Sequence, residues 1–426
     1  VLLIMCPYRI YDTGFLYSFT AVFVIAIYQL VKPKMKGKYY KLKESLSFCI
    51  FIQIGMLPLI IYFQYEAPAF SFLANVAAVP LATCAFTLAF LLIFLPYTVF
   101  HEAISWMIQG VLWISRQSYG MLTIGHVPFL WVLLFYFMTG LWIWKKNGQN
   151  RHIRISLAYV IMIILIWIPM ARRKSLAFLD VGQGDCFVAD TKSGAIIFDG
   201  GSSSEDQVGR YRILPYMKYL GYQKIQIAVI SHMDIDHYSG IKELLEMGKI
   251  KYLGLPEIPK DETMKKIIGI AKKRGTTIFY LSRGRQITTK DGSLKVLHPQ
   301  KNSQMEKNAA SLVMQGKILG YRVLLTGDVE KEGEEELLSE ELERADILKA
   351  AHHGSRFSNT EDFIDEFAPQ NIVISCGKDN SYGHPHRETI ERFENKGIPW
   401  LTTMENGAIT VIVNKNNTEI NTYLDK

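Results

Sequence analysis

The chain shows two hydrophobic patterns, and the change between them falls near Lys174. Up to about Met170 long apolar runs follow one another, whereas from Lys174 onward charges recur every few residues. A membrane-spanning helix needs about 20 mostly apolar residues. Stretches of this kind cover roughly 15–31, 46–63, 72–94, 129–144 and 155–170. We therefore predict a polytopic α-helical membrane domain over residues 1–173 and a separate, charge-rich domain over 174–426.

A sixth stretch, residues 101–115, mixes apolar side chains with His101, Glu102 and Gln109. It either crosses the membrane or lies in the interface as an amphipathic helix. Six lysines in the loop 32–43 and four cations within 145–154 favour the cytoplasmic side for both loops. Both loops can face the cytoplasm only if 101–115 crosses, and the C-terminal domain then lies outside. The cations at 172–174 weigh against this orientation.

The second half is predicted to be a layered α/β domain. Short β-rich runs end in Asp, His or Gly, as in SLAFLDV, AIIFDGG, IQIAVISH, YRVLLTGD and NIVISCG. Helical patterns lie between them, at 212–220, 241–247 and 332–342. Strands that end in polar residues indicate a site along one edge of a sheet. The acidic run 330–344 is predicted to be an exposed helix without a catalytic role.

Candidate metal ligands follow directly on the strand IQIAVIS. His232, Asp234, Asp236 and His237 lie within six residues. Single Asp or His residues often cap helices, but four in this spacing favour a metal site. Asp328, His352 and His353 also follow strands. A mixed imidazole and carboxylate set suits Zn²⁺ or Mn²⁺, and one ion or two sharing Asp328 are both possible.

Composition adds little to this picture. The five cysteines have no CxxC spacing, which disfavours a zinc knuckle or a disulfide framework, and a net charge of +7 indicates no particular partner. The chain starts inside an apolar run without an initiator Met, so we interpret it as a fragment of a longer membrane protein.

These motifs resemble a known family. The order Asp199-Gly-Gly, HxDxDH, Gly-Asp328 and His-His-Gly-Ser is similar to the metallo-β-lactamase fold, an αββα sandwich. The forms LDVGQGD, SHMDIDHYSG and AHHGS, with YDTGFLYSF and ANVAAVP in the membrane half, resemble the ComEC family of DNA-uptake proteins. The resemblance covers nearly the whole chain.

The resemblance implies a channel in the cell membrane that passes single-stranded DNA inward during natural transformation. It also implies a nuclease domain that degrades the other strand, a small extracellular β domain and further helices before residue 1, and contact with membrane lipid. A competence DNA receptor and an ATP-driven translocation partner are expected, since the chain has no P-loop motif of its own.

Two positions depart from the general metallo-β-lactamase pattern. Asp234 stands where the second His of HxHxDH is usual, and Asn308 stands where a later His is usual. Both would bind the first metal, so that site is expected to be weaker, and occupancy by one ion is an alternative. Asp236, His237, Asp328 and one of His352 or His353 would form the second site.

Further residues are assigned to catalysis and substrate binding. In the predicted mechanism Asp236 and Asp328 hold the attacking hydroxide, Lys349 neutralises charge, and His352, His353 or His384 protonates the leaving oxygen. Substrate contacts are expected from Asp185, Asn308 and Ser355, although the DVGQGD segment of Asp185 is equally typical of a turn. Two other functions remain open: a non-catalytic DNA-binding domain, or a membrane-tethered hydrolase of small phosphoesters.

Overall fold

The computed structural model describes residues 5–32, 36–94, 98–115, 120–144, 174–305, 308–338, 342–413 and 418–424. Its contacts divide the chain into two compact units, Val1–Met170 and Ala171–Lys426. The predicted helix at 155–170 lies outside the described residues.

The first unit is helical. After the short helix η1 (Pro7–Tyr11) it contains α2 (Thr13–Val31), α3 (Tyr40–Gln64), α4 (Ser71–Leu91), α5 (Thr98–Ser115) and α6 (Phe129–Trp144). Among the described residues α2, α3 and α4 are long and apolar enough to cross a membrane, and Phe129–Leu141 is a shorter apolar helix. α5, the sixth predicted stretch, is not in that set.

Polar side chains inside this unit satisfy its backbone. The strands β1 (Glu66–Pro68) and β2 (Met121–Thr123) form an antiparallel pair between helices. The Gln53 amide donates to the carbonyls of Pro68 and Ala69, at 2.7 and 3.2 Å, and its oxygen accepts from the Phe72 N–H at 2.7 Å. Gln53 therefore fixes the start of α4, as expected for a polar group that must find its partners within the protein.

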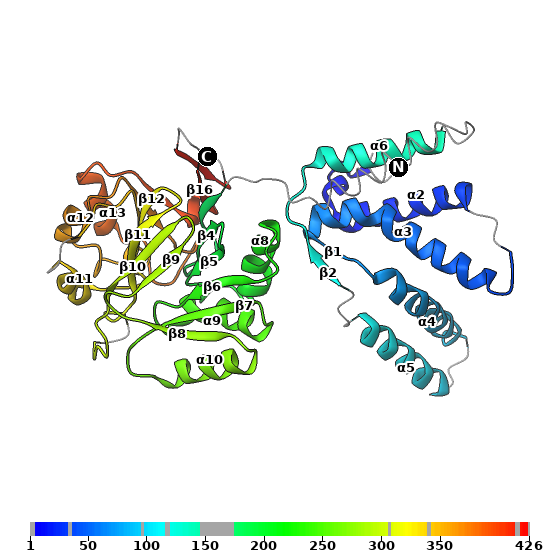
Figure 1. Ribbon diagram of the computed structural model, residues 1–426, viewed down its shortest axis with the longest axis horizontal. Helices are drawn as coiled ribbons and strands as arrows, with labels where there is room; N and C mark the ends of the chain where they lie inside the picture. The colour runs from blue at the N-terminus through cyan, green and yellow to red at the C-terminus, as the bar shows by residue number, and fades with distance from the viewer. Residues whose placement is uncertain are drawn as a thin grey trace. The chain divides into compact units, whose positions relative to one another are not determined.

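The second unit is a sandwich of two mixed sheets (Figure 1). The first sheet has the order β17-β16-β3-β4-β5-β6-β7-β8 and the second β15-β14-β13-β12-β11-β10-β9. The first sheet comprises β3 (Ser175–Phe178), β4 (Phe187–Thr191), β5 (Gly194–Phe198), β6 (Ile225–Val229), β7 (Ile250–Pro256), β8 (Thr277–Leu281), β16 (Ile409–Val413) and β17 (Thr418–Thr422). The second comprises β9 (Gln286–Thr289), β10 (Gly292–His298), β11 (Val313–Ile318), β12 (Tyr321–Leu325), β13 (Ile347–Lys349), β14 (Asn371–Ile374) and β15 (Trp400–Thr402).

Helices cover both outer faces of the sandwich (Figure 1). The first sheet carries η2 (Gly209–Ile213), α8 (Leu214–Tyr219), α9 (Ile235–Glu246) and α10 (Glu262–Lys273), while α11 (Lys331–Leu337), α12 (Glu361–Phe367) and α13 (Arg387–Asn395) cover the second. The short helices η3 (Ala351–Gly354) and α14 (Thr403–Asn406) lie in loops. The predicted αββα architecture is therefore confirmed.

Strand alternation builds three apolar layers. On β3, Leu176 and Phe178 face the other sheet, whereas Ala177 faces the helices. On β12, Val323 packs between the sheets and Leu324 packs against helices. Successive side chains of a strand point to opposite faces, so a strand buried on both faces is apolar throughout. These layers hold the strand ends, and hence the polar loops beyond them, in fixed positions.

Candidate metal centre

The parallel strands of both sheets deliver polar side chains to one edge of the sandwich. β5 runs parallel to β6, and β12, β13 and β14 run parallel to one another. Parallel strands end at the same edge of a sheet, where α/β proteins commonly place their sites. Asp199 follows β5, the segment 232–237 follows β6, and Asp328 follows β12.

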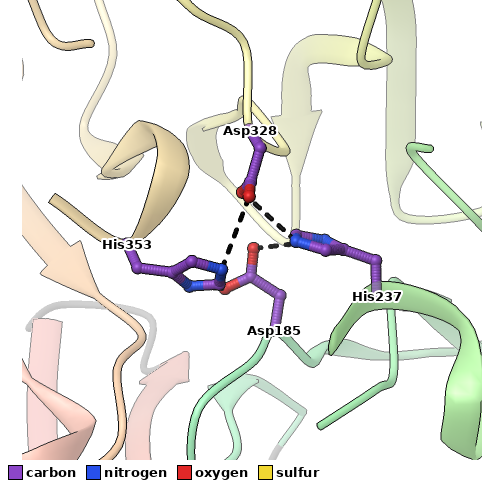
Figure 2. Close-up of side chains that lie close together, drawn as sticks. All are labelled: Asp185, His237, Asp328 and His353. Carbon is purple, nitrogen blue, oxygen red and sulfur yellow. Dashed lines mark ion pairs between the residues drawn. The ribbon is translucent and has the colours of Figure 1, made fainter. Parts of the chain in front are cut away.

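Two of these residues meet two others in a buried cluster, which we call the ligand cluster: Asp185, His237, Asp328 and His353. One ligand atom from each lies within 4.8 Å of the others, and all four residues are buried (Figure 2). Asp328 lies at its centre. One carboxylate oxygen is 3.2 Å from His237 Nε2, and the other is 3.5 Å from His353 Nε2.

The histidines of the cluster are oriented by partners behind them. His353 Nδ1 lies 2.8 Å from the Ser375 carbonyl oxygen, and His237 Nδ1 lies 3.0 Å from Asp199 Oδ2. Both partners accept hydrogen bonds, so each Nδ1 carries a proton and each Nε2 is the atom that could bind an ion in the cluster. Backing of this kind is typical of metal-ligating histidines.

The donor set fits a divalent ion. His237 Nε2, His353 Nε2, Asp328 Oδ1 and Asp185 Oδ1 are buried without a hydrogen-bond partner, whereas Asp185 Oδ2 pairs with the Lys349 ammonium. Buried polar atoms normally have such partners, so unpartnered ligand atoms that converge on one point form a candidate site for a cation. Two imidazoles and two carboxylates are acceptable ligands for Zn²⁺ or Mn²⁺.

The opposite charges of the cluster shift the pKa values of one another. Burial lowers the pKa of His237, but the carboxylates of Asp328 and Asp199 outweigh burial and raise it well above its ordinary value. Burial raises the pKa of Asp328, but His237 and His353 bring it well below its ordinary range. Asp328 is therefore ionised at neutral pH, as a metal ligand must be.

Lys349, predicted to be catalytic, lies beside the cluster at the end of β13. Its ammonium pairs with Asp185 and lies 3.8 Å from Asp328 Oδ1. Burial lowers its pKa, but these two carboxylates raise it above the ordinary value. Lys349 is therefore a buried, charged group.

The other predicted residues of the second metal site lie close by. Asp236 Oδ2 is 3.4 Å from His353 Nε2, and His352 Nε2 is 3.8 Å from Asp328 Oδ2. Burial raises the pKa of Asp236, but His353 and His237 lower it below its ordinary range. His352 and His353 have left-handed backbones, with φ of 50° and 53°. Such strain in residues other than glycine is typical of functional sites.

The residues predicted for the first metal site differ in their surroundings. His232 Nε2 is 3.7 Å from Asp234 Oδ2, and the His232 ring lies 4.1 Å from that of His237. The Asp234 side chain is 39% exposed. Asn308 donates to Glu330 Oε1 at 3.2 Å. Glu330, to which we assigned no role, also lies 3.4 Å from His352 Nδ1.

Two predicted residues have surroundings that change their interpretation. Ser355 is buried, and its hydroxyl accepts from the Phe357 N–H at 3.3 Å, within the loop that follows His353. His384 lies 5.5 Å from His352 between ring centres. Burial, with the nearby His353 and His352, lowers the pKa of His384 to about 4. His384 is thus neutral at pH 7 and carries no proton to donate as an imidazolium.

Asp185 was predicted to contact substrate, and its place among the potential ligands was missed. It lies in the loop from β3 to β4, which is tightly packed. The Asp185 N–H donates to the Asp236 carbonyl at 3.0 Å, and a Cβ on Gly184 would lie 2.3 Å from the Gly201 carbonyl oxygen. The glycines of LDVGQGD therefore permit a close approach of loops. These glycines were the feature of the sequence that could have indicated the position of Asp185 beside the other ligands.

Comparison with known proteins agrees with both units. Residues 1–149 match the family model described as Competence protein, and residues 179–378 match that of the Metallo-beta-lactamase superfamily. The two parts of the chain are thus similar to competence proteins and to metallo-β-lactamase-fold proteins, in that order along the sequence.

Three similar curated proteins carry names linked to competence or recombination. ComE operon protein 3 of Bacillus subtilis (strain 168) is 29% identical over 443 residues, which cover 96% of this chain and 56% of that protein. Competence protein ComA of Neisseria gonorrhoeae is 28% identical over 54% of this chain and 31% of its own length. Recombination protein 2 of Haemophilus influenzae is 25% identical over 62% of this chain and 32% of its own. The chain thus matches between about a third and just over half of each relative.

Proposed function

We propose that residues 174–426 are a metal-dependent phosphodiesterase that cleaves DNA, attached to a channel part formed by residues 1–173. The observation that carries this proposal is the ligand cluster, in which each of the four side chains has a buried ligand atom and most of these atoms have no hydrogen-bond partner. A match to competence proteins supports DNA as the substrate. The strand that is not imported is the expected target.

The residues of the ligand cluster and those beside it would have different roles. Asp185, His237, Asp328 and His353 would hold a Zn²⁺ or Mn²⁺ ion, which supplies Lewis acidity and lowers the pKa of a bound water. Asp236, ionised at neutral pH, would orient the attacking water. Lys349 would stabilise the negative charge that develops on the phosphate. Because His384 is neutral, Lys349 is the better candidate for stabilising the negative charge on the leaving oxygen.

One observation favours a non-catalytic DNA-binding domain as a second candidate. Lys349 already pairs with Asp185 and approaches Asp328, so an ammonium neutralises part of the carboxylate charge that an ion would otherwise balance. If this pair persisted, the domain would bind DNA without hydrolysing it.

An assay of the full chain in detergent separates these candidates. Single- and double-stranded DNA are incubated with Mn²⁺, Zn²⁺ or a chelator. We expect cleavage that requires the ion and that Asp236→Ala reduces by at least about 100-fold, within the range for general acid or base groups. Asp362→Ala, an exposed carboxylate on α12, is the matched control. An active Asp236→Ala, or no cleavage with either ion, would sink the nuclease proposal.

A further inference from the structure

A line of three rings leads from the ligand cluster to the surface. His353 stacks on His384, with ring centres 6.0 Å apart and planes inclined by 28°. His384 in turn stacks on Tyr382, at 5.7 Å and 19°. Exposure rises along the line, from 1% for His353 to 8% for His384 and 57% for Tyr382. The outermost ring therefore continues the stack and remains open to solvent.

The loop that carries Tyr382 is held firmly. The Asn380 amide donates to the carbonyls of Gly377 and His384, at 2.9 and 2.6 Å, and its oxygen accepts from the His384 N–H at 2.9 Å. The His386 N–H donates to the Gly354 carbonyl at 3.0 Å, which ties this loop to the loop of His353. The ring of Tyr382 is thus placed by the backbone that also places a cluster residue.

A single exposed tyrosine is ordinary on a protein surface, but this one is stacked on the site's own histidine. An open aromatic face binds any unpaired nucleobase, because every base has a flat π-face. Bases inside a duplex are already stacked and would have to be unstacked first. We propose that Tyr382 is a stacking platform for an unpaired base beside the phosphodiester to be cleaved, so that the site selects single-stranded over duplex DNA.

This inference rests on the proposed phosphodiesterase function, and a binding assay tests it separately from cleavage. The full chain in detergent is titrated, with a chelator present, against a short fluorescent single-stranded oligonucleotide and an abasic strand of the same length. Tyr382→Ala should weaken binding of the base-bearing strand by on the order of 5- to 150-fold, the range for one stacked base. Its binding of the abasic strand should stay unchanged.

Matched variants sharpen the test. Tyr382→Phe keeps the ring face and should bind both strands as the wild type does. Tyr423→Ala removes a tyrosine that is 82% exposed and should likewise change nothing. Equal weakening on both strands would mean a general structural role and would overturn the platform, as would unchanged binding of the base-bearing strand. If the strand difference appears but the wild type cleaves no DNA with Mn²⁺ or Zn²⁺, the platform stands and the phosphodiesterase proposal fails.

Discussion

At the residue scale, the histidines at 232, 237 and 353 each have Nδ1 within hydrogen-bond distance of an oxygen on the side away from the ligand cluster. Ser231 links two of these arrangements. Its hydroxyl lies 2.8 Å from Asp199 Oδ2 and 3.0 Å from His232 Nδ1. Since the hydroxyl proton goes to the carboxylate, His232 Nδ1 must donate to Ser231 Oγ. His232 Nε2 therefore also presents a lone pair toward the site.

Asp199 is the common acceptor, so its charge should matter for metal affinity. Asp199→Asn suits the left-handed backbone, with φ of 58°, but removes the carboxylate behind His237. We expect metal affinity to fall by about 10- to 100-fold, as for other partners behind metal ligands. Metal content after dialysis measures this. Asp190→Asn, at a buried carboxylate paired with Lys174, should retain the ion; equal retention by both variants would contradict the assigned role.

Metal binding should release protons. The carboxylates of Asp328, Asp199 and Asp185 overcome burial and raise the pKa of His237 and of His353. A raised pKa means that these imidazoles hold a second proton up to a higher pH when no ion is bound, and an ion must displace that proton from Nε2. Affinity should therefore rise with pH and fall as the solution becomes more acidic. Calorimetry in two buffers of different ionisation enthalpy measures the release, and a heat independent of buffer would contradict this account.

At the scale of elements, glycines allow the loops of the site to pack without gaps. A Cβ on Gly201 would lie 2.5 Å from the Ile235 carbonyl oxygen and 2.6 Å from His237 N, both at the start of α9. Backbone atoms cannot move aside cheaply, so a methyl group here must displace the helix that carries His237.

Gly201→Ala should therefore destabilise the domain by about 1–3 kcal/mol, the usual cost of overpacking, and also weaken metal binding. Gly269→Ala is the matched control, because it lies within α10 and a Cβ there meets nothing within 4 Å. It should stabilise by about 0.5–1 kcal/mol. Hydrogen exchange of peptides within 174–426 measures both. If Gly201→Ala left the stability of the domain unchanged, the loops would have more room than the structure indicates.

Element patterns anticipated part of the site and missed part of it. The strand ends that carry His237, Asp328 and His353 follow apolar runs, so their convergence could be predicted from order alone. The acidic run 330–344 was predicted to be simply exposed, and this is wrong for Glu334. It is buried on α11 and accepts from the Asn359 and Thr360 N–H groups, at 2.6 and 2.9 Å. Charge patterning cannot distinguish a solvated glutamate from one that meets backbone donors of a distant loop.

At the scale of the whole molecule, the two units differ in how far their apolar side chains are exposed. The membrane unit exposes large apolar side chains, such as Phe86 at 76%, whereas the second unit buries its apolar residues in three layers. This contrast could be predicted from hydropathy, because the bilayer and water impose different patterns. The side of the membrane on which the second unit lies could not, since it depends on whether 101–115 crosses.

We propose that the hydrolase unit faces outward, which requires the loop at 145–154 to be cytoplasmic. A cysteine introduced near Asn147 should then react with a membrane-impermeant maleimide only after the cells are opened. The exposed Cys6 and Cys84 must first be replaced by serine to remove background labelling. A second cysteine at Asp362, in the hydrolase unit, should react in intact cells. Labelling of the Asn147 position from outside would contradict the outward orientation.

The most direct test of the account is the position of a bound ion. Crystals of the full chain grown with Mn²⁺ or Zn²⁺ would be examined by anomalous diffraction at the metal edge. We predict a peak within coordination distance of His237 Nε2, His353 Nε2 and the Asp328 carboxylate, and its loss in Asp328→Asn. The absence of a peak from the ligand cluster, or a peak held by other residues, would contradict the central claim.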